Sequence, residues 1–313
     1  MKVVGEDRRT GSFRKLWLPQ RPLQHINCQK SESEMSAGCL GAVSGILCVA
    51  LSLRRLPVEF RQMMPEAQVK TFGSLQCRIV REKMDQSPSL IVMLSHGFGA
   101  PGTDLVGLAA PFINTPEVPT DRVAFVFPEA PLDLAHLGMP GGRAWWPINM
   151  EQLAQMYQTR DFAQLTEVEP DGLQDASAKL ASTVEAILEE FQLTQSELFL
   201  GGFSQGAMAS TDLVLRRGFQ PAQLIILSGT MLCRSDWNEM AVSHSGCPVI
   251  QTHGTMDMVL PLEPSEWLRD MLVENGFDVR YQQFPGQHEV PMPALELMAA
   301  AIAEKMSDAT EAH

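Results

Sequence analysis

Short apolar runs that alternate with helical patterns dominate the chain from Val69 onwards. Leu90 to Leu94 and Val123 to Phe127 are apolar at every position, which is typical of strands covered on both faces. The other expected strands are an opening pair at Val69 to Gly73 and Leu75 to Val80, then Leu198 to Leu200, Leu224 to Leu227, Val249 to Thr252 and Val279 to Phe284. The pattern predicts a mostly parallel central sheet.

Helices are expected between these strands. Apolar residues recur at intervals of three and four from Leu173 to Phe191, which gives a helix with one apolar face. Residues 205 to 217, 264 to 275 and 291 to 306 follow the same period, and Asn275-Gly276 is a helix stop. The predicted fold class is α/β, with a sheet flanked by helices. Such sheets place active sites at the carboxyl ends of their strands.

The chain divides into three parts on this pattern. We expect residues 1 to 68 to be a poorly ordered amino-terminal extension, residues 69 to 306 to be one large folded domain, and residues 307 to 313 to be a tail. At 313 residues the chain is long enough for such an arrangement.

The extension contains an apolar stretch, Ala37 to Leu53, which has no charge before Arg54 and Arg55. It is shorter than the roughly 20 residues that span a bilayer, and basic residues lie on both sides. A membrane anchor, a disordered tail and a start codon placed too early all remain open; Met35, Met63 and Met64 are alternative starts. We expect a cytoplasmic protein, with anchoring through residues 37 to 53 as the alternative.

Composition narrows the function classes. The net charge is −13, and the first 56 residues hold nine basic and four acidic residues, so the acidic excess lies in the folded domain. An acidic domain of this kind is a poor nucleic-acid binder. The six cysteines show no zinc-ligand spacing. We expect free thiols and no metal site, although a Cys233–Cys247 pair remains open.

Gly202-Phe203-Ser204-Gln205-Gly206 is a G-x-S-x-G sequence between a predicted strand and a predicted helix. This context is typical of a serine nucleophile on a tight, strained turn, where the glycines avoid collisions with neighbouring backbone. The alternative is a serine in an ordinary glycine-rich turn.

A serine nucleophile needs a base, and the base needs a group that fixes its tautomer. In this strand–turn–helix arrangement the chain order is serine, acid, histidine, which Asp257 and His288 satisfy, each in a turn after a predicted strand. The competing residues are Asp236 for the acid and His96, His244 and His253 for the base. We expect His96 and His253 to brace loops by hydrogen bonds, and His313 is terminal.

An oxyanion hole requires backbone N–H groups aimed at the developing charge, one of them from the residue after the nucleophile. That residue is Gln205, and the Ser95-His96-Gly97-Phe98-Gly99 loop after an early strand offers Phe98 N–H as the second donor. The glycines of this loop could instead serve only to turn the chain.

Together GFSQG, HGFG, HGTMD and the late GQH resemble the phospholipase/carboxylesterase family of α/β-hydrolases, which includes the acyl-protein thioesterases. The resemblance covers about residues 69 to 306 and implies the α/β-hydrolase fold. It also implies a triad of Ser204, Asp257 and His288, with Phe98 and Gln205 as oxyanion donors.

The chain departs from the family in two places. The loop reads HGFGAPGTDL rather than the thioesterases' HGLGDTG, and residues 131 to 172 form a longer, lid-like insertion. Within it, Arg143-Ala144-Trp145-Trp146 is similar to the family's R-x-W-F element. The insertion's large apolar residues would form an acyl-binding wall or ordinary core; they are Trp145, Trp146, Met150, Met156, Tyr157 and Phe162.

The sequence therefore predicts a serine hydrolase that cleaves carboxylic esters or thioesters through an acyl-enzyme on Ser204, with Trp145 and Trp146 as substrate-binding residues. We expect no cofactor, no metal, a small-molecule ester or acyl substrate and no nucleic-acid partner. The alternatives are a non-catalytic binding module of the same fold and a peptide hydrolase with the same triad. The oligomeric state is open.

Overall fold

The computed structural model describes residues 66–149, 151, 158–159 and 161–311. The apolar stretch at 37 to 53 lies outside these residues, as do Met150, Met156 and Tyr157 of the insertion. Within the described ranges, none of the helices has both the length and the apolar character needed to cross a membrane.

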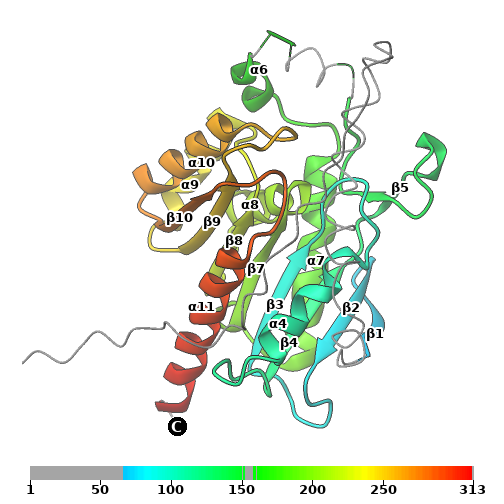
Figure 1. The fold of residues 1–313 in the computed structure, drawn as a ribbon, viewed down its shortest axis with the longest axis vertical. Coiled ribbons are helices and arrows are strands. Elements are labelled where there is room, and N and C mark those ends of the chain that lie inside the picture. Colours follow the sequence, from blue (N-terminus) through cyan, green and yellow to red (C-terminus); the bar gives the residue numbers. More distant parts are fainter. Residues whose placement is uncertain (1–65, 150, 152–157, 160, 312–313) are drawn as a thin grey trace, which may run out of the picture. The chain divides into compact units, whose positions relative to one another are not determined.

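An eight-stranded sheet runs through the domain in the order β1-β2-β4-β3-β7-β8-β9-β10 (Figure 1). Strand β2 pairs antiparallel with both β1 and β4, and all the other neighbours are parallel. The strands are β1 (Gln68–Phe72), β2 (Leu75–Arg81), β3 (Leu90–Ser95), β4 (Val123–Pro128), β7 (Leu198–Phe203), β8 (Gln223–Leu227), β9 (Pro248–Gly254) and β10 (Asp278–Phe284). The predicted mostly parallel sheet and α/β fold are confirmed.

The long helices agree closely with the sequence pattern. They are α7 (Leu173–Phe191), α8 (Gln205–Arg217), α10 (Leu262–Glu274) and α11 (Met292–Glu311). Helix α10 ends as predicted: Gly276 has φ +82°, and Phe277 N–H donates to the carbonyl of Leu272. Helix α11 continues to Glu311, so it includes most of the segment expected to be a tail.

Several short elements have no strong sequence period and were not predicted. They are α4 (Ala109–Ile113), α9 (Arg234–Ala241), α6 (Phe162–Glu167) and a two-stranded ribbon of β5 (Leu132–Asp133) and β6 (Arg143–Ala144). The ribbon and α6 belong to the expected insertion, which is therefore folded where it is described.

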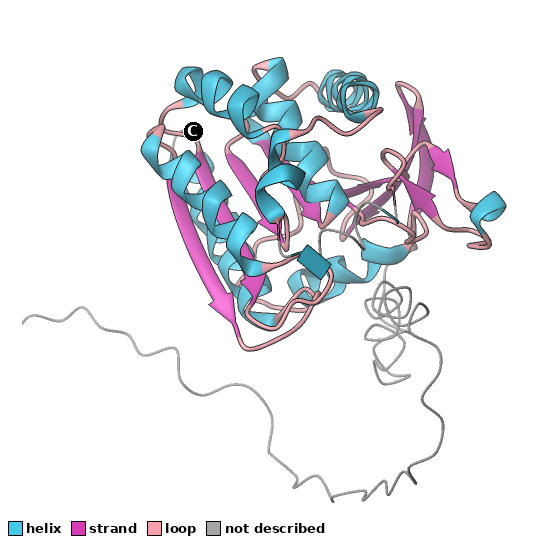
Figure 2. Ribbon diagram, turned by 90° about the horizontal axis from the view of Figure 1, so that it is seen from above, coloured by secondary structure: helices cyan, strands magenta, loops and turns pink. Residues whose placement is uncertain are grey.

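Alternate residues of the central strands face opposite sides of the sheet. In β3, Ile91 and Met93 belong to one apolar cluster, while Leu90, Val92 and Leu94 belong to another. Helices α7, α8 and α10 contribute to the first cluster, and α4 and α11 contribute to the second. Helices accordingly cover both faces of the sheet (Figure 2).

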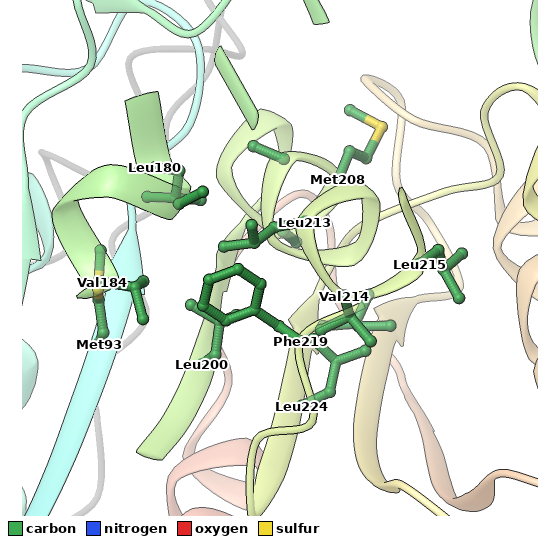
Figure 3. Packing of buried hydrophobic residues seen from close by; sticks show 14 of the residues in the cluster. Met93, Leu180, Val184, Leu200, Met208, Leu213, Val214, Leu215, Phe219 and Leu224 are labelled. Atoms are coloured by element: carbon green, nitrogen blue, oxygen red, sulfur yellow. The ribbon is translucent and has the colours of Figure 1, made fainter. Parts of the chain in front are cut away.

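Figure 3 shows the first cluster at the middle of the sheet. Met93 and Leu200 of neighbouring strands pack with Val184 of α7 and Leu213 of α8. Burying each such side chain stabilises the fold by about 1.5–3 kcal/mol. This packing holds α8 rigidly, and α8 carries the turn on which the candidate nucleophile lies.

Candidate active site

Ser204 lies between β7 and α8 with φ 56° and ψ −121°, a conformation that only the surrounding structure can hold. Such strain costs on the order of 1–3 kcal/mol and is common at functional sites. The Ser204 N–H donates to the carbonyl of Leu227 at 2.9 Å, which ties the turn to the end of β8. The tight turn predicted from the G-x-S-x-G sequence is therefore present.

Close backbone contacts explain the two glycines of this turn. A Cβ on Gly202 would lie 2.3 Å from the carbonyl oxygen of Ser95, and one on Gly206 would lie 2.1 Å from the same atom. The end of β3 thus lies directly against the turn. A Cβ on Gly97 would lie 3.2 Å from Cβ of Ser204, so the loop after β3 passes beside the serine.

Asp257 and His288 form a buried pair. His288 Nδ1 lies 2.7 Å from Asp257 Oδ2, and Asp257 Oδ1 accepts the N–H groups of Val259 and Leu260, each at 2.8 Å. A carboxylate accepts only, so Nδ1 carries the proton and Nε2 is left with its lone pair. This is the tautomer that a general base requires.

Strands β9 and β10 bring the two residues together. The strands pair in parallel up to Gly254 and Phe284, and the bonding continues beyond them, because Met256 N–H donates to the carbonyl of Gly286 at 2.9 Å. A Cβ on Gly254 would lie 2.2 Å from the carbonyl oxygen of Gln287. The acid loop and the base loop are thus packed backbone to backbone.

His288 also lies beside the serine turn. Its ring packs on Phe203, the residue before Ser204, with 4.6 Å between ring centroids. Among the described residues no hydrogen bond joins Ser204 Oγ to His288. Such contacts are often long without substrate and shorten when it binds.

The two expected oxyanion donors are backbone N–H groups without a hydrogen-bond partner in the described part of the chain. They belong to Phe98 and Gln205, whereas the next amide of the loop, Gly99 N–H, donates to the carbonyl of Arg143 at 2.9 Å. Gln205 is the first residue of α8, where N–H groups are unpaired and the helix dipole is positive. Both amides are available to an anionic oxygen.

The two bracing histidines behave as expected. His96 Nδ1–H donates to the carbonyl of Gly97 at 2.8 Å, and Nε2 accepts the N–H of Ala130 at 3.1 Å. Burial lowers the pKa of His96 to about 4, so the ring is neutral. His253 Nε2–H donates to the carbonyl of Leu260 at 2.8 Å, and burial lowers its pKa as well.

The other competing residues lie elsewhere. Asp236 is exposed on α9, and His244 is buried in the short helix that follows it. Asp257, and neither of these, makes the hydrogen bond to His288.

Trp145 and Trp146 are buried, with 1% and 3% of their surface exposed, and both belong to the first apolar cluster. The Trp145 indole N–H donates to the carbonyl of His96 at 2.8 Å. The burial favours ordinary core over an acyl-binding wall; contact with substrate stays a prediction. Phe162, at the start of α6, is partly buried.

Sequence reasoning missed the side chain of Gln205. Its Oε1 accepts the N–H of Trp145, and its Nε2 donates to the carbonyl of Trp146, both at 2.9 Å. The sequence shows only a glutamine after the serine; its burial, and its partners about 60 positions away, come from the fold.

The described chain offers no cluster of three His, Cys, Asp or Glu residues that could bind a metal ion. Cys77, Cys233 and Cys247 are free thiols, so the pairing left open for the last two is absent. Burial raises the pKa of Cys233 to about 12, which makes it a poor nucleophile at neutral pH.

Curated relatives and solved structures resemble this chain. It is 26% identical over 172 residues to acyl-protein thioesterase 1 of Debaryomyces hansenii, which covers 53% of this chain and 68% of that protein. It is 26% identical over 189 residues to acyl-protein thioesterase 1 of Eremothecium gossypii, which covers 59% and 74%.

Among solved structures, esterase PE8 has a TM-score of 0.58 at 24% identity and covers 76% of this chain and 99% of its own. A carboxylesterase from Mesorhizobium loti has a TM-score of 0.57 at 16% identity, with coverage of 76% and 99%. At these identities the likeness shows the α/β-hydrolase fold. The phospholipase/carboxylesterase family model matches residues 75–305, and the chain belongs to that family.

Proposed function

We propose that this protein is a serine hydrolase that cleaves carboxylic esters or thioesters through an acyl-enzyme on Ser204. The observation that carries the proposal is the buried His288–Asp257 pair, with 2.7 Å between Nδ1 and Oδ2, beside a serine held at φ 56°. Family membership supports an ester or thioester substrate.

The first half-reaction forms the acyl-enzyme. His288 Nε2 removes the proton from Ser204 Oγ as that oxygen attacks the acyl carbon, and Asp257 stabilises the imidazolium. The carbonyl oxygen becomes an oxyanion that accepts hydrogen bonds from Phe98 N–H and Gln205 N–H. The tetrahedral intermediate collapses, and His288 gives the proton to the leaving alkoxide or thiolate.

The second half-reaction releases the acid. His288 removes a proton from water, whose oxygen attacks the acyl carbon, and the same two amides stabilise the second oxyanion. Collapse breaks the bond to Ser204 Oγ, which takes the proton back from His288. The cycle consumes one water and requires no cofactor.

The candidate substrates are esters and thioesters of short or longer acyl chains, and lysophospholipids. The relatives named above are acyl-protein thioesterases, which supports inclusion of acyl thioesters. The loop after His96-Gly97 and the long insertion differ from those of the thioesterases. The length of the acyl chain is therefore part of the proposal and is not carried over from them.

Trp146 tests whether the insertion contacts the acyl chain. If it lines an acyl site, Trp146→Ala raises KM for octanoate esters more than for acetate esters. If it only fills core, as its burial favours, both substrates are affected equally and the loss is in stability, by about 3–5 kcal/mol.

The main test is turnover of p-nitrophenyl acetate, butyrate and octanoate by the wild type and by Ser204→Ala. We expect turnover by the wild type and a loss of about 10⁴-fold or more in kcat for the variant, because the nucleophile is gone. Peptide hydrolysis is tested with a peptide library. A folded wild type that hydrolyses no ester or thioester would favour the binding-module alternative.

The cytoplasmic location and the membrane contact through residues 37 to 53 also belong to this proposal. Fractionation of the tagged full-length protein tests them. Recovery in the soluble fraction is expected, and recovery in membranes would favour the anchor.

A further inference from the structure

The two proposed oxyanion donors come from segments more than 100 residues apart, and one short segment touches both. We define the strap as residues 143–146, which includes β6 and the two tryptophans. The strap contacts the loop that carries Phe98 on one side and the residue Gln205 on the other.

The strap holds the Phe98 loop by three hydrogen bonds. Arg143 N–H donates to the carbonyl of Ala100 at 3.1 Å, and the Arg143 carbonyl accepts Gly99 N–H at 2.9 Å. The Trp145 indole N–H donates to the carbonyl of His96 at 2.8 Å. Phe98 thus lies between bonded positions on both sides.

Arg143 anchors the strap to the end of β4. Its Nε donates to the carbonyl of Ala130 at 2.9 Å and lies 3.4 Å from Glu129 Oε1, and Glu129 also pairs with Arg78 of β2 at 2.9 Å. These charged groups are only partly exposed, so water screens the ion pairs less than it would at the surface, and the pairs tie the strap to β4 and β2.

The side chain of Gln205 joins the serine turn to this strap. Its carbonyl oxygen accepts Trp145 N–H and its amide donates to the Trp146 carbonyl, so both ends of the amide are satisfied while only 1% of the residue is exposed. A buried polar group satisfied in this way has one allowed position. The bonds therefore fix the distance between the Gln205 and Phe98 amides.

We propose that the Gln205 side chain is a positioning residue that, through the strap, sets the spacing of the Phe98 and Gln205 amides and so tunes stabilisation of the oxyanion. The proposal rests on the proposed function and deepens it. It differs from the role of the Gln205 backbone, because a side-chain substitution leaves the N–H in place. A displacement of one donor weakens binding of the transition state more than binding of the substrate.

Gln205→Met tests it, because methionine has nearly the same length and forms neither bond. We expect kcat/KM for p-nitrophenyl butyrate to fall about 10-fold to 100-fold, while KM stays within about threefold of wild type. This fall in rate is smaller than the fall caused by removal of a whole oxyanion donor. Affinity for a trifluoromethyl ketone, which forms an oxyanion on the serine, should fall by the same factor. The apparent pKa of the kcat/KM profile should not move, since the Asp257–His288 pair is held elsewhere.

Gln251→Met is the matched control. Gln251 is a buried glutamine of β9 whose amide donates to the carbonyl and hydroxyl of Ser265, so the change removes two hydrogen bonds away from the strap. It should lower stability and leave kcat/KM per labelled active site unchanged. Trp145→Phe removes the indole bond to His96 and part of a buried ring but keeps the backbone bond to Gln205; it should reproduce part of the Gln205→Met effect and serves if Gln205→Met does not fold.

Three outcomes would overturn the proposal. They are a Gln205→Met enzyme within threefold of wild type, a rate loss without a matching loss of ketone affinity, and an equal rate loss in Gln251→Met. If wild-type protein neither turns over esters nor reacts with a fluorophosphonate, the proposed function itself fails, and that result is distinct from failure of the strap.

Discussion

The acid–base side of the candidate site and its oxyanion side differ in how far apart in the sequence their hydrogen-bonded residues lie. On the acid–base side, Asp257 accepts N–H groups from residues two and three positions away. On the oxyanion side, Gln205 and Trp145 are bonded although 60 positions separate them. A local turn holds Asp257, and the paired strands β9 and β10 bring His288 to it over 31 positions, whereas contacts over about 60 positions hold the oxyanion side.

This difference has a consequence for mutation. The turn at Asp257 is held by its own backbone N–H groups, so damage to the orientation of Asp257 should come mainly from changes in that turn. Long-range contacts depend on the rigid sheet between them, so the oxyanion side should be sensitive to changes that leave every reacting group in place. Four predictions test this contrast.

Asp257→Asn should give the largest effect, a loss of about 10⁴-fold in kcat, because the amide no longer holds His288 as the Nδ1–H tautomer or stabilises the imidazolium. The side-chain oxygen still accepts the N–H groups of Val259 and Leu260, so we expect an unfolding midpoint close to wild type. Steady-state kinetics and thermal unfolding check both. A variant that keeps a tenth of wild-type kcat would contradict the assignment of Asp257.

Gly206→Ala should break the oxyanion side without removal of any functional group. The added methyl lies 2.1 Å from the Ser95 carbonyl oxygen and 2.6 Å from that of His96, and backbone cannot move away easily. We expect a cost of about 3 kcal/mol or more in urea unfolding, together with loss of activity.

Gly218→Ala is the control for this change. A Cβ at Gly218 has no neighbour within 4 Å, so the substitution costs only the backbone strain of an alanine at φ +73°, about 1 kcal/mol. Equal destabilisation by the two variants would show that the contact with the end of β3 does not matter.

Acidification should weaken the oxyanion side through His96, which braces the Phe98 loop while neutral. Its pKa falls from 6.5 to about 4 on folding because of burial. Between about pH 6.5 and 4, His96 is protonated in the unfolded chain but neutral in the folded chain. Its contribution to the free energy of unfolding is therefore full above pH 6.5 and falls as the pH drops towards 4. The loss in the free energy of unfolding over this range is about 3 kcal/mol, because each unit of difference in pKa contributes about 1.4 kcal/mol.

Urea unfolding of wild type and His96→Asn between pH 7 and 4 measures the effect. Since the asparagine does not titrate, the difference between the two stabilities should shrink as the pH falls. A difference independent of pH would mean that His96 does not titrate as argued.

His253 should give the smallest effect, because it takes no part in the reaction and only supports Asp257: its Nε2 donates to the carbonyl of Leu260 at 2.8 Å and lies 3.4 Å from Asp257 Oδ2. His253→Ala should lower kcat/KM about tenfold, or about 1.4 kcal/mol, by loosening the turn that holds Asp257. His253→Gln, whose Nε2 can replace the imidazole donor, should recover most of the loss. If glutamine is no better than alanine, the Leu260 bond is not what matters.

The same contrast explains what the sequence could predict. The strands, the long helices and the strained turn at Ser204 follow from local patterns: apolar runs, a period of 3.6 and glycines at positions two residues either side of the serine. The proximity of Asp257 and His288 could be predicted because each follows a strand, and parallel strands bring their carboxyl ends to one edge. The amides of Phe98 and Gln205 could be chosen by the same reasoning.

The strap could not be predicted in that way. Trp145 and Trp146 have the composition of an acyl-binding wall, and only the fold shows that both are buried and that one bonds to His96. The ribbon of β5 and β6 is two residues per strand, too short for a periodic signal. The amide of Gln205 has partners chosen by tertiary structure alone.

Reaction with a fluorophosphonate, followed by peptide mapping, tests the central claim most directly, because this reagent labels a serine hydroxyl only where an active site activates it. The account predicts a single labelled residue, Ser204, in wild-type protein, and no labelling of folded Ser204→Ala or, at the same exposure time, of Asp257→Asn. Label on another residue, or no label on folded wild type, would contradict a triad built on Ser204.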